Sequence, residues 1–153
     1  MKRIDEIDKQ IIEILQEDSR FTNSDLGGKL GISEATVRRR IERLLDQDII
    51  RLVAVANPFK IGYELVVIIG LRVEKPRMAD IEKQLTDLPD VRFLGVTLGS
   101  YDFMLEAWFR STEKLLIFLT ETLVEIPGIL STDSFQIIKL AKYTYDWGKP
   151  TAV

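Results

Sequence analysis

The spacing of the apolar side chains changes about one third of the way along the chain, and this change limits the folds that the chain can adopt. Before residue 50, apolar side chains recur at helical intervals, as in Ile7, Ile11, Ile14 and Leu15. After residue 63, runs rich in β-branched residues alternate with helical patterns. We therefore expect two small domains within the 153 residues.

The first part of the chain predicts three short helices. The first covers residues 5–17 and has acidic residues in its first turn, where they interact favourably with the helix dipole. The second follows Thr22 or Asn23 and carries Gly27, a small residue suited to a close helix crossing. Gly31 then supplies a turn, and Ser33 caps the third helix.

The third helix, "SEATVRRRIERLL" over residues 33–45, has an apolar face and a polar face. A rotation of 100° per residue places four residues on the face that packs on a core: Val37, Ile41, Leu44 and Leu45. Ala35, Thr36, Arg39 and Arg43 lie opposite, and Arg38 and Arg40 lie on the two flanks. We expect the four arginines to face outward as a group.

Three short helices with a turn before a basic third helix are typical of a helix-turn-helix, whose last helix enters the DNA major groove. The alternative is a helix with a solvated, charged face. DNA binding is favoured because the chain has a formal net charge of -3 and still gathers its arginines here. The DNA-binding candidates are Ser33, Ala35, Thr36, Arg38, Arg39, Arg40 and Arg43, with Arg39 and Arg43 near bases and Arg38 and Arg40 near phosphates.

The segment that joins the two parts, "IIRLVAVANPFKIGY" over residues 49–63, reads as a strand that stops at Pro58. The Asn57–Pro58 turn and Gly62 mark a hinge. The predicted domains are a helix-turn-helix over 1–50, a strand and hinge over 51–63, and a second domain over 64–153.

The second part predicts the order βαββαβ. Strands are expected over 64–74, 91–98, 101–109 and 130–140, with helices from Pro76 to about Leu88 and from Thr112 to about Glu125. Only Gly99 and Ser100 separate the two middle strands, as in a tight hairpin. The order is that of a ferredoxin-like sheet with both helices on one face, so the fold class is α+β.

The predicted strands are apolar on both faces. Helices can cover only one face, so the other needs a partner. We expect a homodimer through the uncovered side, at Val66, Ile68, Met104 and Trp108. A two-fold dimer is also what a helix-turn-helix requires to read two half-sites.

Composition excludes several classes of protein. The chain has no cysteine and no histidine, which removes disulfides, thiolate metal sites, histidine bases and axial-histidine haem. We expect neither a metal nor a cofactor, and no enzyme activity. No apolar run approaches the roughly 20 residues that span a bilayer, and the start lacks a signal-peptide core. We expect a cytoplasmic protein with no membrane partner.

The chain resembles the Lrp/AsnC family of leucine-responsive, or feast/famine, transcription regulators over essentially its full length. The resemblance rests on "IDEIDKQIIEILQEDSRFTNSDLGGKLGIS", "ATVRRRIERLLDQDII", "AVANPFKIGY" and "VTLGSYDFML". It implies a winged helix-turn-helix joined to a ligand-sensing RAM domain. It also implies dimers that assemble to tetramers or octamers, with an amino acid bound between dimers.

Carried over by position, the resemblance implies an effector site at Gly99, Ser100, Tyr101 and Asp102, with Thr132 and Ser134. Gly99 can bring backbone N–H groups close to a carboxylate, Asp102 can pair with an α-ammonium group, and Tyr101 can supply a wall or a hydroxyl. The alternative is that this stretch is only a turn that Asp102 caps. Leu98 also departs from the family, in which threonine commonly precedes the glycine.

Three other functions are alternatives to a transcription regulator that answers to an effector. Sirohaem decarboxylases resemble two-domain relatives of these regulators, but they depend on histidines that this chain lacks. A DNA-binding architectural protein that answers to no effector is the second. The third is a ligand-binding or assembly protein with a decayed DNA-binding domain, which the retained arginines of the third helix oppose.

Overall fold

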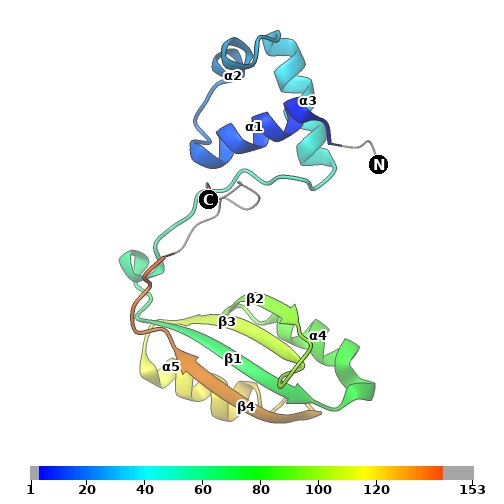
Figure 1. Ribbon diagram of the computed structural model, residues 1–153. Coiled ribbons are helices and arrows are strands. Elements are labelled where there is room, and N and C mark those ends of the chain that lie inside the picture. The colour runs from blue at the N-terminus through cyan, green and yellow to red at the C-terminus, as the bar shows by residue number, and fades with distance from the viewer. Residues whose placement is uncertain (1–3, 143–153) are drawn as a thin grey trace. The chain divides into compact units, whose positions relative to one another are not determined.

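The computed structural model describes residues 4–142 (Figure 1). The chain divides into two compact units whose boundary lies between Ala54 and Val55, and the second unit spans Val55–Ala141. None of the described helices is long and apolar enough to cross a membrane.

The first unit contains three helices, α1 (Glu6–Glu17), α2 (Asn23–Leu30) and α3 (Glu34–Asp46), as predicted. Asp5, Thr22 and Ser33 are the N-caps, and each accepts a hydrogen bond from a backbone N–H in the first turn of its helix. The helices enclose an apolar cluster of Ile11, Leu15, Leu26, Val37 and Leu44. Helix-turn-helix packing therefore follows from one apolar stripe on each helix.

The two adjacent glycines of α2 have different surroundings. A Cβ atom on Gly27 would lie 2.7 Å from the carbonyl oxygen of Ile32, which is too close for any other residue, whereas a Cβ on Gly28 would meet nothing within 4 Å. Gly27 therefore permits the close approach of α2 to the turn before α3, as predicted. The structure offers no packing reason for Gly28.

We expect opposite effects from alanine at these two positions. Gly27→Ala should destabilise the protein by about 1–3 kcal/mol because the neighbouring backbone must move. Gly28→Ala should stabilise it by about 0.5–1 kcal/mol because alanine costs less chain entropy in a helix. Urea denaturation of both variants measures the difference, and equal shifts in both would contradict the packing assigned to Gly27.

The strand that was predicted to run from residue 49 and to stop at Pro58 is not formed. Residues 50–57 adopt neither helix nor strand, and Pro58–Ile61 form a short 3₁₀ helix. The apolar residues of this stretch are exposed, with 50%, 68% and 52% of Leu52, Val53 and Val55 accessible. A β-branched run needs a hydrogen-bonding neighbour to become a strand, and among residues 4–142 none pairs with it. The described part of the first unit thus contains no β wing.

The second unit has the predicted βαββαβ order. Its strands are β1 (Leu65–Val73), β2 (Val91–Val96), β3 (Phe103–Phe109) and β4 (Ile129–Gln136). A 3₁₀ turn at Lys75–Arg77 leads into α4 (Met78–Asp87), and α5 (Thr112–Ile117) continues as a π-helical turn, Phe118–Thr122. The last strand ends before residue 140, where the sequence placed its end.

The four strands form one sheet in the order β2-β3-β1-β4, with every neighbouring pair antiparallel. Alternate residues of β1 and β3 point to the face covered by α4 and α5, where a single core includes Leu71, Ile81, Leu105 and Phe118 (Figure 1). We call the other side the open face; Phe93, Met104, Trp108, Val66, Ile68 and Phe135 lie on it. The ferredoxin-like prediction is confirmed.

The hairpin between β2 and β3 is longer than predicted. Val96 pairs with Phe103, so residues 97–102 form a six-residue loop rather than a two-residue turn. Hydrogen bonds hold this loop: the Thr97 N–H donates to the carbonyl of Asp102, and the Thr97 hydroxyl donates to the carbonyl of Tyr101, at 2.9 and 2.7 Å. The loop is an ordered structure of its own.

Candidate DNA-reading and effector sites

The N-terminal half of α3 presents the outward surface predicted for DNA. Ala35, Arg38 and Arg39 are exposed and Thr36 is half-buried. Ser33 serves the helix itself, since its hydroxyl accepts from the Thr36 N–H at 3.2 Å and lies 2.8 Å from the Thr36 hydroxyl. Among residues 4–142, neither Arg38 nor Arg39 has a side-chain hydrogen bond or ion pair, so their exposed guanidinium groups remain candidates for DNA contacts.

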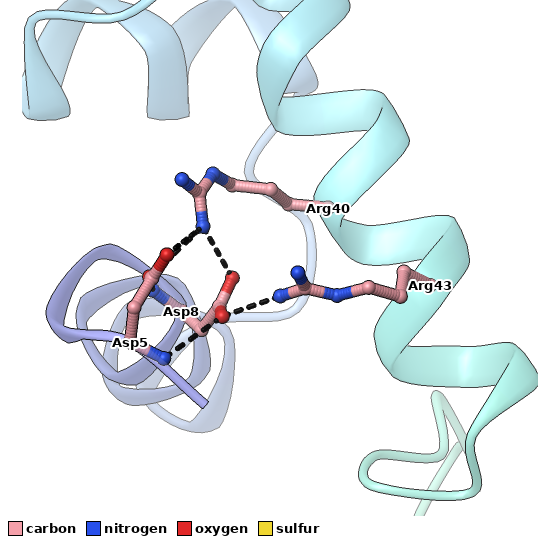
Figure 2. A network of polar contacts seen from close by, with 4 residues as sticks. All are labelled: Asp5, Asp8, Arg40 and Arg43. Atoms are coloured by element: carbon pink, nitrogen blue, oxygen red, sulfur yellow. Dashed lines mark hydrogen bonds and ion pairs between the residues drawn. The ribbon is translucent and has the colours of Figure 1, made fainter. Parts of the chain in front are cut away.

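Arg40 and Arg43 turn toward α1 instead (Figure 2). Nη1 of Arg40 donates to Oδ2 of Asp5 at 2.7 Å and to Oδ1 of Asp8 at 2.8 Å. Nη2 of Arg43 donates to the second oxygen of Asp8. The Asp8 side chain is fully buried, and those of Arg40 and Arg43 are only 19% and 21% exposed. We call these four residues the ion-pair cluster.

The prediction that all four arginines face outward is therefore wrong for Arg40 and Arg43. A buried carboxylate is stable only when cations and hydrogen bonds replace its water, and these two guanidinium groups supply them. The sequence did carry a signal, because Asp8 lies three residues before Ile11 and seven before Leu15, on the apolar face of α1. The prediction for Asp8 considered only the favourable interaction of its charge with the helix dipole.

The ion-pair cluster also shifts the titration of its members. The hydrogen bond from Arg40 is the main cause that lowers the pKa of Asp5 from 3.8 to about 2, with the Asp8 N–H as a second donor. Asp5 and Asp8 in turn raise the pKa of Arg40. The Asp5 carboxylate thus has two tasks, since it caps α1 and also anchors α3.

Because the pKa of Asp5 is lower in the folded state, its ionisation contributes stability above pH about 4 that is lost as the pH falls toward 2. Arg40→Gln removes the cation that lowers this pKa. We expect the parent protein to be more stable than Arg40→Gln at neutral pH and this advantage to shrink between pH about 4 and 2. Denaturant titrations across that range measure it, and a difference that is independent of pH would contradict the assignment.

The second candidate site is the loop at residues 97–102, where Gly99, Ser100, Tyr101 and Asp102 come together as predicted. The carboxylate of Asp102 points into the fold: Oδ2 accepts from the Val73 N–H at 2.9 Å and Oδ1 accepts from the ammonium of Lys75. Lys75 and then the Val73 N–H lower the pKa of Asp102. Val73 lies at a register shift between β1 and β4, where it needs this acceptor.

This geometry corrects the role assigned to Asp102. Its carboxylate already pairs with Lys75, so an effector ammonium could reach it only by displacing that side chain. The alternative, that Asp102 caps its own turn, also differs from what is observed, because its carboxylate bonds to the Val73 N–H and to Lys75 rather than to an N–H of the loop. Thr132 and Ser134 also lie apart from Tyr101, because they pair with Leu71 and Ile69 and so point to the helix-covered face.

Tyr101 lies on the open face, where its ring covers Gly70. A Cβ on Gly70 would be 2.7 Å from ring atoms of Tyr101, so only glycine permits this contact. Partial burial raises the pKa of Tyr101, and a hydrogen bond to the Asp133 side chain raises it further. The guanidinium carbon of Arg72 lies 5.9 Å from the centre of the same ring. The Tyr101 side chain therefore lies near both a guanidinium group and a carboxylate.

Sequence analysis missed Arg72 and Asp133. Both are exposed and share the open face with Gly70, because Asp133 pairs directly with Gly70 and Arg72 is two residues further along β1. Nε of Arg72 donates to the carbonyl of Ser100 at 2.9 Å, which ties β1 to the loop. An arginine within the apolar run 64–74 was a visible signal, but its neighbours depend on the pairing of β1 with β4.

The open face carries the residues predicted to form a dimer. Met104, Ile68 and Trp108 are partly exposed, whereas Val66 is buried within the chain, with 6% accessible. Trp108 already has neighbours, since Tyr63 meets its ring edge-on at 5.5 Å and Arg92 lies 5.6 Å from it. Phe93 and Phe135 add apolar area, with 59% and 51% exposed. This face remains largely uncovered by the chain itself.

A capped three-helix unit with an exposed basic recognition helix, followed by a ferredoxin-like sheet with an ordered polar loop, defines a two-domain regulator that binds DNA and a small ligand. Comparisons agree: residues 4–45 match the AsnC-type helix-turn-helix domain, and residues 66–147 match the Lrp/AsnC ligand binding domain. The chain belongs to the Lrp/AsnC family of transcriptional regulators, and it is not an enzyme.

Relatives of similar length support this assignment. The chain is 35% identical over 144 residues to an uncharacterised HTH-type transcriptional regulator of Pyrococcus abyssi, covering 94% of this chain and 91% of that one. It is 35% identical over 127 residues to the HTH-type transcriptional regulator LrpA of Pyrococcus horikoshii, covering 82% and 90%. A transcriptional regulator of Neisseria meningitidis in complex with L-Met has a similar structure, with a TM-score of 0.85, 25% identity and coverage of 94% and 96%.

Proposed function

We propose that this regulator reads a specific DNA sequence as a homodimer and that an amino acid, bound beside Tyr101, modulates its assembly. The observation that carries the effector part of the proposal is the pair of opposite charges, Arg72 and Asp133, near Tyr101. Since we propose chromosomal DNA as its partner, the proposal places the protein in the cytoplasm.

For DNA, we propose that Thr36, Ala35 and Arg39 approach base edges and that Arg38 contacts phosphate. Arg39 lies one turn after Ala35 and three residues after Thr36, so the three share one side of α3. An arginine at a base edge forms two parallel hydrogen bonds with guanine, which gives sequence preference. Ser33 contributes by holding the first turn of α3 in place.

For the effector, we propose that Arg72 receives the α-carboxylate and Asp133 the α-ammonium group of a free amino acid. Arg72 uses Nε on the Ser100 carbonyl, so both of its Nη groups remain for a carboxylate. Within residues 4–142 neither Arg72 nor Asp133 forms an ion pair, so their charges are not already neutralised. The Tyr101 ring and the backbone of Gly99 and Ser100 would border the ligand. The L-Met complex of the Neisseria meningitidis regulator supports this ligand class.

Calorimetry of each common amino acid against the full chain tests the effector proposal. For an amino acid that binds, Arg72→Gln and Asp133→Asn should each weaken binding by about tenfold or more, because each removes a charge-assisted hydrogen bond worth about 1.5–3 kcal/mol. Arg77→Gln and Asp87→Asn are matched controls elsewhere in the same domain and should bind as the parent does.

Ligand analogues sharpen this test. The α-amide of the bound amino acid should be insensitive to Arg72→Gln, and its α-hydroxy analogue should be insensitive to Asp133→Asn, since each lacks the charge concerned. An amino acid that binds equally well to both variants would place the site elsewhere. If no amino acid binds the parent, the effector-independent DNA-binding protein is the better description.

We also propose that the open face forms the homodimer and that dimers assemble further to a tetramer or octamer. Tyr101, Arg72 and Asp133 share this face, so a ligand there would border the interface and would favour whichever assembly it contacts more fully. Exposed apolar side chains on one face of a sheet supply the area that such an interface buries.

Met104→Asp tests the dimer proposal. It would place an unpaired carboxylate in an apolar interface, which is strongly destabilising, so we expect the dimer to dissociate. Leu116→Asp is the control, since Leu116 is 59% exposed on α5, away from the open face. Sedimentation velocity of both variants measures the change. A dimer that persists in Met104→Asp would assign the interface to another surface.

A further inference from the structure

We infer that Arg40 and Arg43 are positioning residues, which act on DNA reading through Asp5 and Asp8 by fixing the orientation of α3 on α1. The inference concerns how the recognition helix is set, and it does not depend on the proposed effector. It also divides the arginines of α3 into two that meet DNA, Arg38 and Arg39, and two that hold the helix.

The arrangement of the contacts supports a role in orientation. Arg40 and Arg43 lie nearly one turn apart on α3, and each takes a different oxygen of the same Asp8 carboxylate. Arg40 takes both oxygens of Asp5 as well, at 2.9 and 2.7 Å. Two anchors separated along α3 and joined at one point on α1 resist both rotation and sliding of α3 (Figure 2).

Apolar packing alone does not supply this constraint. Val37 and Leu44 hold α3 against the core, but burial of apolar area is non-directional and tolerates small rotations. Charge-assisted hydrogen bonds are short and directional, so they fix an angle that packing leaves soft. Buried polar groups that set a register are the best-attested use of a buried ion pair.

The charge balance of the cluster points the same way. The two carboxylates of Asp5 and Asp8 cancel the two guanidinium charges, so the cluster presents no net positive charge to a phosphate. Arg39 borders the same shallow pocket as Asp5, Arg40 and Arg43 but has no carboxylate partner among residues 4–142. Because Arg39 is next to Arg40 on α3, a small rotation of this helix would also move the Arg39 side chain.

Asp8→Asn separates this inference from the electrostatic alternative. If Arg40 and Arg43 were phosphate contacts restrained by Asp8, removing its charge would free them, tighten binding and steepen the dependence of affinity on salt. If they position α3, the same substitution should lower affinity for a selected site by tenfold or more, leave affinity for random duplex nearly unchanged and leave the salt dependence no steeper. The phosphate-contact role thus predicts tighter binding of the selected site by Asp8→Asn, whereas the positioning role predicts weaker binding.

The experiment uses the full chain, a duplex selected from a random pool by the parent protein, and a random duplex. Arg38→Met is the contact control, because we propose that Arg38 contacts phosphate, and it should reduce the slope of log K against log salt by about 0.9. Arg43→Met keeps the side-chain stem, and it should reduce the ratio of specific to random binding with the slope unchanged. Thermal unfolding confirms that each variant is folded at the assay temperature.

Arg43→Lys keeps the inference testable if Asp8→Asn does not fold. Lysine retains the positive charge and loses the planar fork, so a positioning role predicts lost sequence preference and a phosphate contact predicts binding close to the parent. Tighter binding by Asp8→Asn, or a loss of slope in Arg43→Met equal to that in Arg38→Met, would overturn the inference.

Discussion

A carboxylate that is removed from water must be given cations, and in the first unit Asp8 receives two from the recognition helix. This requirement links three features of the unit. It joins α1 to α3, it uses Asp5 both as a helix cap and as an anchor, and it withdraws Arg40 and Arg43 from the surface. The surface that we propose for DNA is therefore the N-terminal half of α3, with Ala35, Thr36, Arg38 and Arg39.

The second unit follows a different constraint, which is the imbalance between the two faces of its sheet. Helices α4 and α5 cover one face and bury Leu71, Leu105 and their neighbours, while on the open face Phe93 is exposed and Met104 is half-buried. The Tyr101 ring also lies on the open face, and it fits there because Gly70 has no side chain. The surfaces that we propose for assembly and for the effector are therefore continuous. A ligand bound there would change the stability of the interface directly.

Local chemistry explains why so much of the secondary structure could be predicted. Thr22, Ser33 and Gly31 mark helix ends by capping and by a left-handed backbone, and these effects act within a few residues. The segment over residues 49–63 shows the limit of such reasoning, because Val53 and Val55 favour a strand but no described neighbour supplies hydrogen bonds. The prediction of a two-residue turn between β2 and β3 was wrong for a similar reason. The Asp102 carboxylate accepts a hydrogen bond from the Val73 N–H of β1, and this contact with another strand belongs to a six-residue loop.

The sequence was sufficient to predict the two domains, the helix-turn-helix, the order of helices and strands in the second domain, the second apolar face of its sheet and the family. Each of these follows from residue spacing, from turn chemistry or from motifs that are contiguous in the chain. Long-range packing was needed to show which arginines face outward, that Asp102 is paired with Lys75, and that Arg72 and Asp133 lie near Tyr101. The reason is physical: the partner of a charged side chain lies on another element, and helical spacing specifies the face from which a side chain leaves but not the group that it meets.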